Sequence, residues 1–161
     1  MVYSNEQVMA YLPHRDPFLF VDYIESISLL DTKKFYTLEE LVGGYVVGFY
    51  KTKSDHSIFK GHFPGNPILP GVLQVEIMAQ VSAFLVTRMK GDAPLGSYRI
   101  EVALLGIDKA RFKKPIYPNQ TLKIKAKLER FRKFLMQFSA EIEVEGQIVS
   151  SCEFSASISF L

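Results

Sequence analysis

One long and almost entirely apolar segment constrains the fold of this chain more than any other feature. Residues 71 to about 89 read GVLQVEIMAQVSAFLVTRM, and their apolar side chains recur at helical spacing on nearly every side. A helix that is apolar all round is expected inside a protein rather than on its surface. With 161 residues, of which 48% are hydrophobic, the chain has enough apolar side chains to enclose it. The sequence therefore predicts one central, buried helix.

The residues after this helix alternate in polarity, which indicates strands. Lys123, Lys125 and Lys127 alternate with apolar residues, and Glu141 and Glu143 do the same further on. Period-two alternation with one polar face is typical of an antiparallel sheet that has one face in water. Strands are expected at about 98–105, 108–116, 121–131, 134–145 and 147–160, with a tight hairpin at Gly146.

Shorter elements are expected before the central helix. The capping-box pattern Ser-Asn-Glu-Gln at 4–7 predicts a short helix that runs to about Tyr11 and stops at Pro13. Strands are expected at 18–28 and 45–51, whereas residues 30–42 fit no element clearly. Residues 54–70 form a long loop dense in glycine and proline, and loops of this kind often carry function.

These elements predict an α+β fold with a single domain over residues 1–161. An antiparallel sheet of about five or six strands must cover its apolar face, and the one long central helix can do so. The predicted architecture is therefore a sheet wrapped around that helix.

The cysteine count and the apolar runs indicate the compartment. The single cysteine, Cys152, excludes an intramolecular disulfide and fits a reducing environment. The N-terminus has no basic start followed by an apolar stretch, as a signal peptide would. The apolar run at 41–50 reaches only about half the length of a membrane helix. We therefore expect a cytoplasmic protein without membrane insertion.

Charge and histidine spacing argue against two further classes of function. A net charge of +2 is too small to indicate nucleic-acid binding, and the lysine-rich strands lack interleaved aromatic residues. The three histidines and the cysteine match no compact ligand spacing, so we expect neither a metal nor another cofactor. The basic residues between 109 and 133 are interpreted as solvated strand faces or as a docking surface for an acidic carrier. The candidates for docking are Arg88, Arg111 and Lys113.

Two residues near the start of the central helix are candidates for acid–base chemistry. His62 lies in the loop stiffened by glycine and proline, and Glu76 is a lone carboxylate in an otherwise apolar helix. Burial raises the pKa of a carboxyl group, so Glu76 is expected to keep a proton near neutral pH and to act as a general acid. A neutral histidine accepts a proton at the same pH. One base and one acid across a small substrate can eliminate water.

The start of the central helix is a third feature that could take part in the chemistry. Other interpretations of the helix start, His62 and Glu76 stay open. The free N–H groups near Gly71 carry partial positive charge, and glycine allows a thioester carbonyl to approach the backbone. Alternatively, His62 could be bonded in its loop for structure only. Glu76 could face solvent or pair with Arg88 or Arg99, and the loop could be only a rigid connection.

Residues 61–80 closely resemble the active-site motif of the bacterial 3-hydroxyacyl-[acyl-carrier-protein] dehydratases. The matching string is GHFPGNPILPGVL, followed by Glu-x-Met-Ala-Gln. The N-terminal signature of that family is matched by LPHR at 12–15 with PF at 17–18, and VD at 21–22 fits as well. GIDKARF at 106–112 resembles its next recognisable strand. The resemblance spans nearly the whole chain, and its central motif is highly specific.

This resemblance implies a hot-dog fold, a homodimer or a hexamer of three dimers, and dehydration of a 3-hydroxyacyl chain on acyl carrier protein in fatty-acid or related synthesis. His62 would be the base that removes the C2 proton, and Glu76 of the neighbouring subunit would protonate the departing C3 hydroxyl. The Gly71 N–H would polarise the thioester carbonyl. Gln80, one turn after Glu76, and Phe63 would complete the substrate site.

A few positions depart from the family pattern. Asp16 stands where an aromatic residue is usual, and Ala103 falls where many members have a tyrosine. Ser-Ala at 82–83 replaces small glycines, and residues 30–42 resemble an insertion. These differences leave the acid and the base in place. They leave open the acyl-chain length and a specialised role outside housekeeping fatty-acid synthesis.

Two other functions fit the same expectations. A hot-dog thioesterase would hydrolyse the thioester and release a free thiol, whereas a dehydratase would produce an enoyl thioester. A non-catalytic carrier-binding subunit would bind without turnover and would be unaffected by His62→Ala. The presence of both His62 and Glu76 favours the dehydratase over these alternatives.

Overall fold

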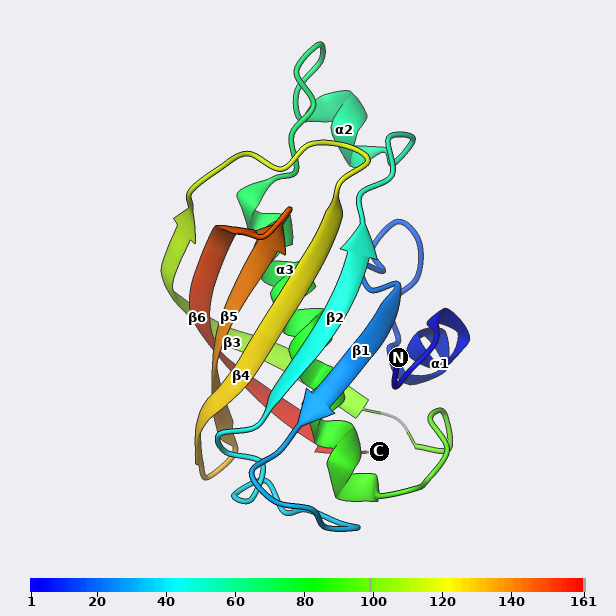
Figure 1. Ribbon diagram of the computed structural model, residues 1–161, viewed down its shortest axis with the longest axis vertical. Coiled ribbons are helices and arrows are strands. Elements are labelled where there is room, and N and C mark those ends of the chain that lie inside the picture. Colours follow the sequence, from blue (N-terminus) through cyan, green and yellow to red (C-terminus); the bar gives the residue numbers. More distant parts are fainter. Residues whose placement is uncertain (99, 161) are drawn as a thin grey trace.

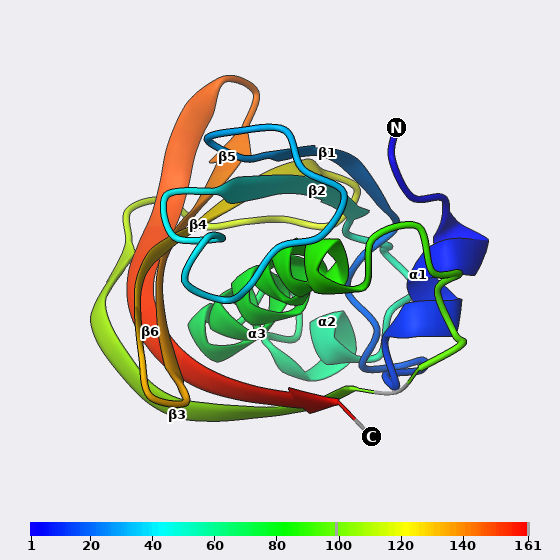
Figure 2. The ribbon, with the colours of Figure 1, turned by 90° about the horizontal axis from the view of Figure 1, so that it is seen from below.

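A strongly curved antiparallel sheet wraps around one central helix in the computed structural model, which describes residues 1–98 and 100–160 (Figures 1 and 2). Within these residues six strands form the sheet, in the order β1-β2-β4-β5-β6-β3. The strands are β1 (Tyr23–Ser28), β2 (Tyr45–Lys51), β3 (Ile100–Phe112), β4 (Thr121–Arg132), β5 (Leu135–Val144) and β6 (Gln147–Phe160). The predicted α+β architecture is confirmed.

The central helix consists of α3 (Gly71–Ser82), which continues directly into the 3₁₀ helix η1 (Ala83–Lys90). Its buried apolar side chains form the middle of the core together with those of β4. The change to a tighter helix coincides with hydroxyl groups that bond to the preceding turn. Ser82 donates to the carbonyl of Ala79, and Thr87 donates to that of Phe84, both at 2.7 Å. Such bonds compete with regular helical bonding.

The same central segment is apolar enough to resemble a membrane span. By length and composition alone Gly71–Lys90 could cross a membrane, but 67% of its most apolar stretch is buried inside the protein. Burial of this extent is typical of a core helix.

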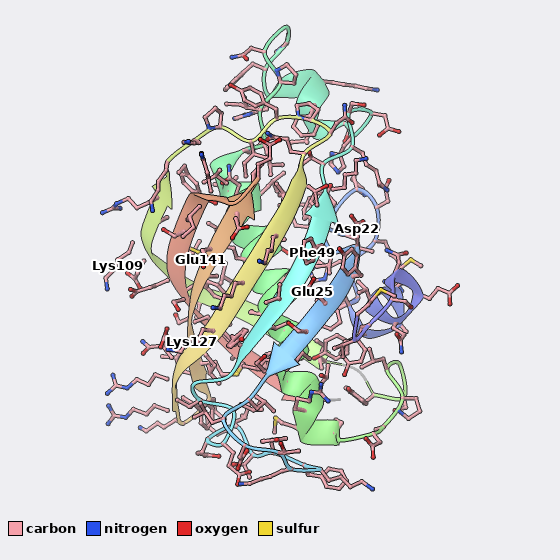
Figure 3. All side chains as sticks on the ribbon, in the orientation of Figure 1. Asp22, Glu25, Phe49, Lys109, Lys127 and Glu141 are labelled. Atoms are coloured by element: carbon pink, nitrogen blue, oxygen red, sulfur yellow. The ribbon has the colours of Figure 1, made fainter. Side chains whose placement is uncertain are left out.

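The two faces of the sheet differ as the alternation predicts. On β4, Leu122, Ile124 and Leu128 are fully buried against the helix. The lysines between them lie on the opposite face, where Lys125 stands across from Glu141 on β5. Figure 3 shows the side chains of Lys127 and Glu141 on the face turned away from the helix. These contacts favour the interpretation of the strand lysines as a solvated face.

Several predicted boundaries need correction. The two strands expected at 98–105 and 108–116 are one strand, β3, because Gly106 lies at a bulge against β6 instead of ending the strand. The first strand begins at Tyr23 and not at 18, since the backbone before it is bonded to the central helix. The loop at 54–70 contains a short helix, α2 (Ile58–Gly61).

The N-terminal helix and the segment at 30–42 are both held by local hydrogen bonds. Helix α1 (Asn5–Tyr11) follows its capping box, in which the Ser4 N–H donates to Oε1 of Gln7 at 2.9 Å. Residues 30–42 form turns around the buried Tyr36, whose hydroxyl donates to the Asp31 carbonyl at 2.8 Å. Residues 30–42 are therefore packed around an aromatic ring of their own.

Strand β3 forms one edge of the sheet and leaves apolar side chains exposed. Between 39% and 58% of each of the following side chains is accessible in the single chain: Val102, Leu104, Leu105, Ile107 and Phe112. An edge strand with apolar side chains on it is a site for pairing with another chain. The edge at β3 is therefore the part of the fold best suited to association.

Candidate active site

His62 follows α2 directly, and one of its ring nitrogens is bonded within the loop. Its Nδ1 lies 3.0 Å from the carbonyl oxygen of Ile68. A carbonyl only accepts hydrogen bonds, so Nδ1 must carry a proton, and in the neutral ring Nε2 then has a free lone pair. The structural and functional interpretations of this histidine are thus compatible, because the loop bond uses Nδ1 and leaves Nε2 available to accept a proton.

The loop around His62 closes on itself through backbone bonds. Ile68 N–H donates to the His62 carbonyl at 2.9 Å, and Phe63 and Asn66 exchange two bonds at 3.2 and 3.0 Å. The ring of Phe63 stacks on that of His62, with centroids 4.0 Å apart, and is 51% exposed. Phe63 therefore presents an apolar surface beside the imidazole.

Glu76 lies in the second turn of α3, and its side chain is 24% exposed. Its Oε1 accepts a hydrogen bond from Nε2 of Gln80 at 2.8 Å and lies 3.4 Å from Nε2 of His14. The expected contact between Gln80 and Glu76 is therefore present. Of the alternative partners, Arg88 forms no ion pair with Glu76 within the described residues, and Arg99 lies outside them.

The expectation of a raised pKa for Glu76 is wrong for the single chain. The hydrogen bond from His14 lowers the pKa of this carboxyl group below its usual value. Burial acts in the opposite direction, and the bond from Gln80 adds to the lowering. Sequence reasoning assumed a carboxylate surrounded by apolar side chains, whereas two N–H groups point at it.

Gln80 connects the helix to the N-terminal segment. Its side chain is almost fully buried, at 2% exposed. The Phe20 N–H donates to Oε1 of Gln80, and Nε2 of Gln80 donates to the Phe18 carbonyl, both at 2.9 Å. These two contacts fix which end of the amide faces Glu76, so that Gln80 must offer an N–H there.

Gly71 is the first residue of α3 and is covered by Phe112 from the end of β3. A Cβ at position 71 would lie 2.8 Å from Cε2 of the Phe112 ring. The N–H groups of the first helical turn have no partner inside the helix. Leu73 and Gln74 both donate to the Pro70 carbonyl, at 3.1 and 3.2 Å. A side chain at position 71 would therefore require the Phe112 ring or the helix start to shift.

Within the single chain, the structure brings only some of the predicted site residues together. His62 and Glu76 form no hydrogen bond or ion pair with each other within the described residues. Arg111 and Lys113 are exposed and flank Phe112, close to the helix start. Arg88 lies near the other end of the helix, roughly 25 Å away at the usual rise per residue. The three basic candidates therefore do not form one surface.

Sequence reasoning missed the part that His14 plays. The residue appeared only within the N-terminal signature and as a rejected metal ligand, although it contacts Glu76 directly. The match of LPHR at 12–15 to the N-terminal signature of the family was the sequence signal that could have pointed to His14. Among the described residues, no group of three or more His, Cys, Asp or Glu side chains is placed to hold a metal ion.

Comparison with known proteins identifies clear relatives in sequence. The FabA-like domain family matches residues 12–153. The chain is 37% identical over 153 residues to the 3-hydroxyacyl-[acyl-carrier-protein] dehydratase FabZ of Thiobacillus denitrificans, covering 95% of each chain. It is 34% identical over 158 residues to the FabZ of Rickettsia rickettsii, covering 98% of this chain and 97% of that one.

Solved structures share the fold at lower sequence identity. The dehydratase heterocomplex ApeI:P from Xenorhabdus doucetiae matches with a TM-score of 0.66 and 19% identity, over 93% of this chain and 89% of that one. A thioesterase superfamily member from Thermus thermophilus matches with a TM-score of 0.58 and 14% identity, over 73% and 82%. The hot-dog fold is therefore confirmed.

Proposed function

Because this chain belongs to the FabA-like family and, within it, to the FabZ-type 3-hydroxyacyl-[acyl-carrier-protein] dehydratases, we infer that it is a hydro-lyase of fatty-acid synthesis. It converts a 3-hydroxyacyl chain on acyl carrier protein to the trans-2-enoyl thioester. The sequence relatives favour this reaction over thioester hydrolysis, since the structural likeness to thioesterases concerns the fold alone.

We propose that His62 is the base and Glu76 the acid of this reaction. Nε2 of His62 takes the proton from C2 of the substrate, and the electrons of the C–H bond form the new double bond. The C3–O bond breaks, and the hydroxyl group leaves as water with the proton of Glu76. The observation that carries the proposal is the bond from Nδ1 of His62 to the Ile68 carbonyl, which makes Nε2 the nitrogen that can accept a proton in the neutral ring.

The Gly71 N–H serves as the donor for the thioester oxygen in this proposal. Negative charge develops on that oxygen while the C2 proton leaves, and the positive end of α3 is already oriented towards it. Phe63, exposed beside His62, contributes an apolar surface for the acyl chain. Gln80 acts through Glu76 instead of touching the substrate.

The proposed catalytic unit is a homodimer that pairs through β3, and three such dimers would make the hexamer. The exposed apolar side chains of β3 support this arrangement. Pairing would bring His62 of one chain towards Glu76 of the other, in keeping with the absence of a hydrogen bond or ion pair between them within the described residues of one chain. We place the protein in the cytoplasm, where the free, buried Cys152 stays reduced.

The proposal is tested by incubating the protein with 3-hydroxyacyl carrier proteins of several chain lengths and measuring loss of water by mass spectrometry. His62→Ala and Glu76→Gln are each expected to lower kcat by on the order of 10²-fold or more. Circular dichroism should show an unchanged fold. Near-normal rates in both variants would refute the assignment, and release of a free thiol by the wild type would indicate a thioesterase.

A further inference from the structure

The two oxygens of the Glu76 carboxyl group have different surroundings. Oε1 receives the N–H of Gln80 and faces the imidazole of His14. Within the described residues, Oε2 accepts no hydrogen bond. One oxygen is therefore held by the protein, and the other is left for a substrate.

His14 reaches Glu76 from the loop that follows α1. The guanidinium of Arg15 donates to the carbonyls of Leu12 and His14, at 2.8 and 2.6 Å, and stabilises the loop segment that carries the imidazole. Nδ1 of His14 is buried and has no hydrogen-bond partner in the described part of the chain. A charged ring would place a second N–H at this atom, which is costly without an acceptor. We assign the single proton of the ring to Nε2, facing Glu76.

We propose that His14 is a positioning residue for the catalytic acid: together with Gln80 it holds Oε1 of Glu76 by N–H groups, so that Oε2 carries the proton that is transferred. This inference rests on the role of Glu76 given above. When the leaving hydroxyl group takes the proton from Oε2, the carboxyl group becomes negative. The two N–H groups at Oε1 are then already in place to stabilise that charge. His14 keeps its own proton throughout the step.

The pKa of Glu76 agrees with this geometry. The hydrogen bond from His14 is the largest cause that lowers this pKa, and the bond from Gln80 acts in the same direction. Among the described residues, His14 in the N-terminal loop is the titratable group that contributes to the lowering, and Gln80 on α3 is neutral. Because the lowered pKa leaves this carboxyl group ionised at neutral pH in the single chain, it has to take up a proton before it can act as the acid, and the N–H groups at Oε1 then stabilise the anion that forms when the proton leaves.

The inference is tested by comparing His14→Leu, which removes the donor, with His14→Gln, whose amide can place an N–H near the position of Nε2. In His14→Leu we expect kcat to fall roughly tenfold, while KM changes by less than about twofold. The titration midpoint of the Glu76 carboxyl group, followed by the NMR signal that is absent from Glu76→Gln, should rise. His14→Gln should restore most of both properties, which a purely structural role for the ring would not predict.

The outcomes separate this inference from the proposed function. Full activity of Glu76→Gln would show that Glu76 is not the acid. An inactive Glu76→Gln protein combined with normal kcat and an unchanged midpoint in His14→Leu would overturn the role of His14 alone. If His14→Leu does not fold, His14→Asn replaces it, because its amide reaches only the position of Nδ1. Equal activity of His14→Asn and His14→Gln would then count against the inference.

Discussion

The ring of Phe112, the last residue of β3, covers the Cα of Gly71, the first residue of α3. A Cβ at position 71 would lie only 2.8 Å from the ring. The contact joins the edge strand, where a second chain is proposed to pair, to the helix start, where the thioester is proposed to bind. A substitution at either residue is therefore expected to affect the backbone N–H groups that we propose to face the thioester.

The first prediction concerns this contact. Gly71→Ala should displace the Phe112 ring or the first helical turn and so misplace the N–H that binds the thioester oxygen. We expect kcat to fall by roughly 10- to 100-fold, within the range found when one such donor is lost. Steady-state kinetics with a carrier-bound substrate measure the effect. In a Phe112→Ala background the added methyl group has space, so Gly71→Ala should lower kcat much less there. Equal losses in both backgrounds would contradict this explanation.

The second prediction concerns the buried amide of Gln80. Gln80→Leu leaves the Phe20 N–H and the Phe18 carbonyl without partners, so we expect a loss of about 3 kcal/mol in the free energy of unfolding. Urea denaturation at fixed protein concentration measures it. Gln74→Leu is a matched control on the same helix, because Gln74 is also buried but makes one bond of 3.2 Å and leaves its Oε1 unpartnered. If both variants lose the same stability, the bonds of Gln80 are not the cause.

Much of the fold could be predicted from the sequence because its signals are local. The central helix is apolar on nearly every side, and the lysine and glutamate alternation of β4 and β5 defines two sheet faces directly. The division of β3 at Gly106 was wrong for a physical reason. A glycine that ends a strand and a glycine that occupies a bulge look the same in sequence, and only pairing with β6 distinguishes them.

The sequence predicted the elements that carry the candidate site residues and one contact between them, but not the electrostatics around Glu76. The loop of His62 and the helix of Glu76 were both recognised, as was the contact from Gln80 one turn away. The lowered pKa of Glu76 was not predicted, because the main cause of the lowering is a hydrogen bond from His14, which comes from a distant part of the chain. Helical spacing predicts neighbours on one helix, whereas a contact between the N-terminal loop and α3 depends on the whole fold.

The third prediction follows from the lowered pKa of Glu76. A carboxyl group with a lower pKa in the folded state stabilises the protein at pH values above its usual 4.5, and this contribution disappears as the pH falls through the folded value. Glu76→Gln should therefore be less stable than the wild type at neutral pH, and the difference should shrink in acid. Urea denaturation at a series of pH values measures it. In a His14→Leu background the pH-dependent part should be smaller. A difference that grows towards low pH would contradict the direction of the shift.

The fourth prediction concerns carrier docking at the end of β3. Arg111→Glu with Lys113→Glu should raise KM for a carrier-bound substrate by roughly 3- to 10-fold, since exposed charge pairs contribute little individually. KM for a small thioester analogue should not change. Arg88→Glu is the comparison, because Arg88 lies near the far end of the central helix and should affect neither substrate. Equal effects of the double variant on both substrates would argue against docking at this surface.

The last prediction asks whether the acid and the base come from different chains. His62→Ala and Glu76→Gln proteins, each inactive alone, should regain activity when mixed under conditions that allow chains to exchange. In a symmetric dimer, random exchange leaves about a quarter of the sites with both an intact His62 and an intact Glu76, so about that share of wild-type activity should return. Exchange is verified with chains that carry different tags. If exchange is verified and the mixed dimers stay inactive, each site must be built from one chain, and the proposal that the acid and the base come from different chains would be wrong.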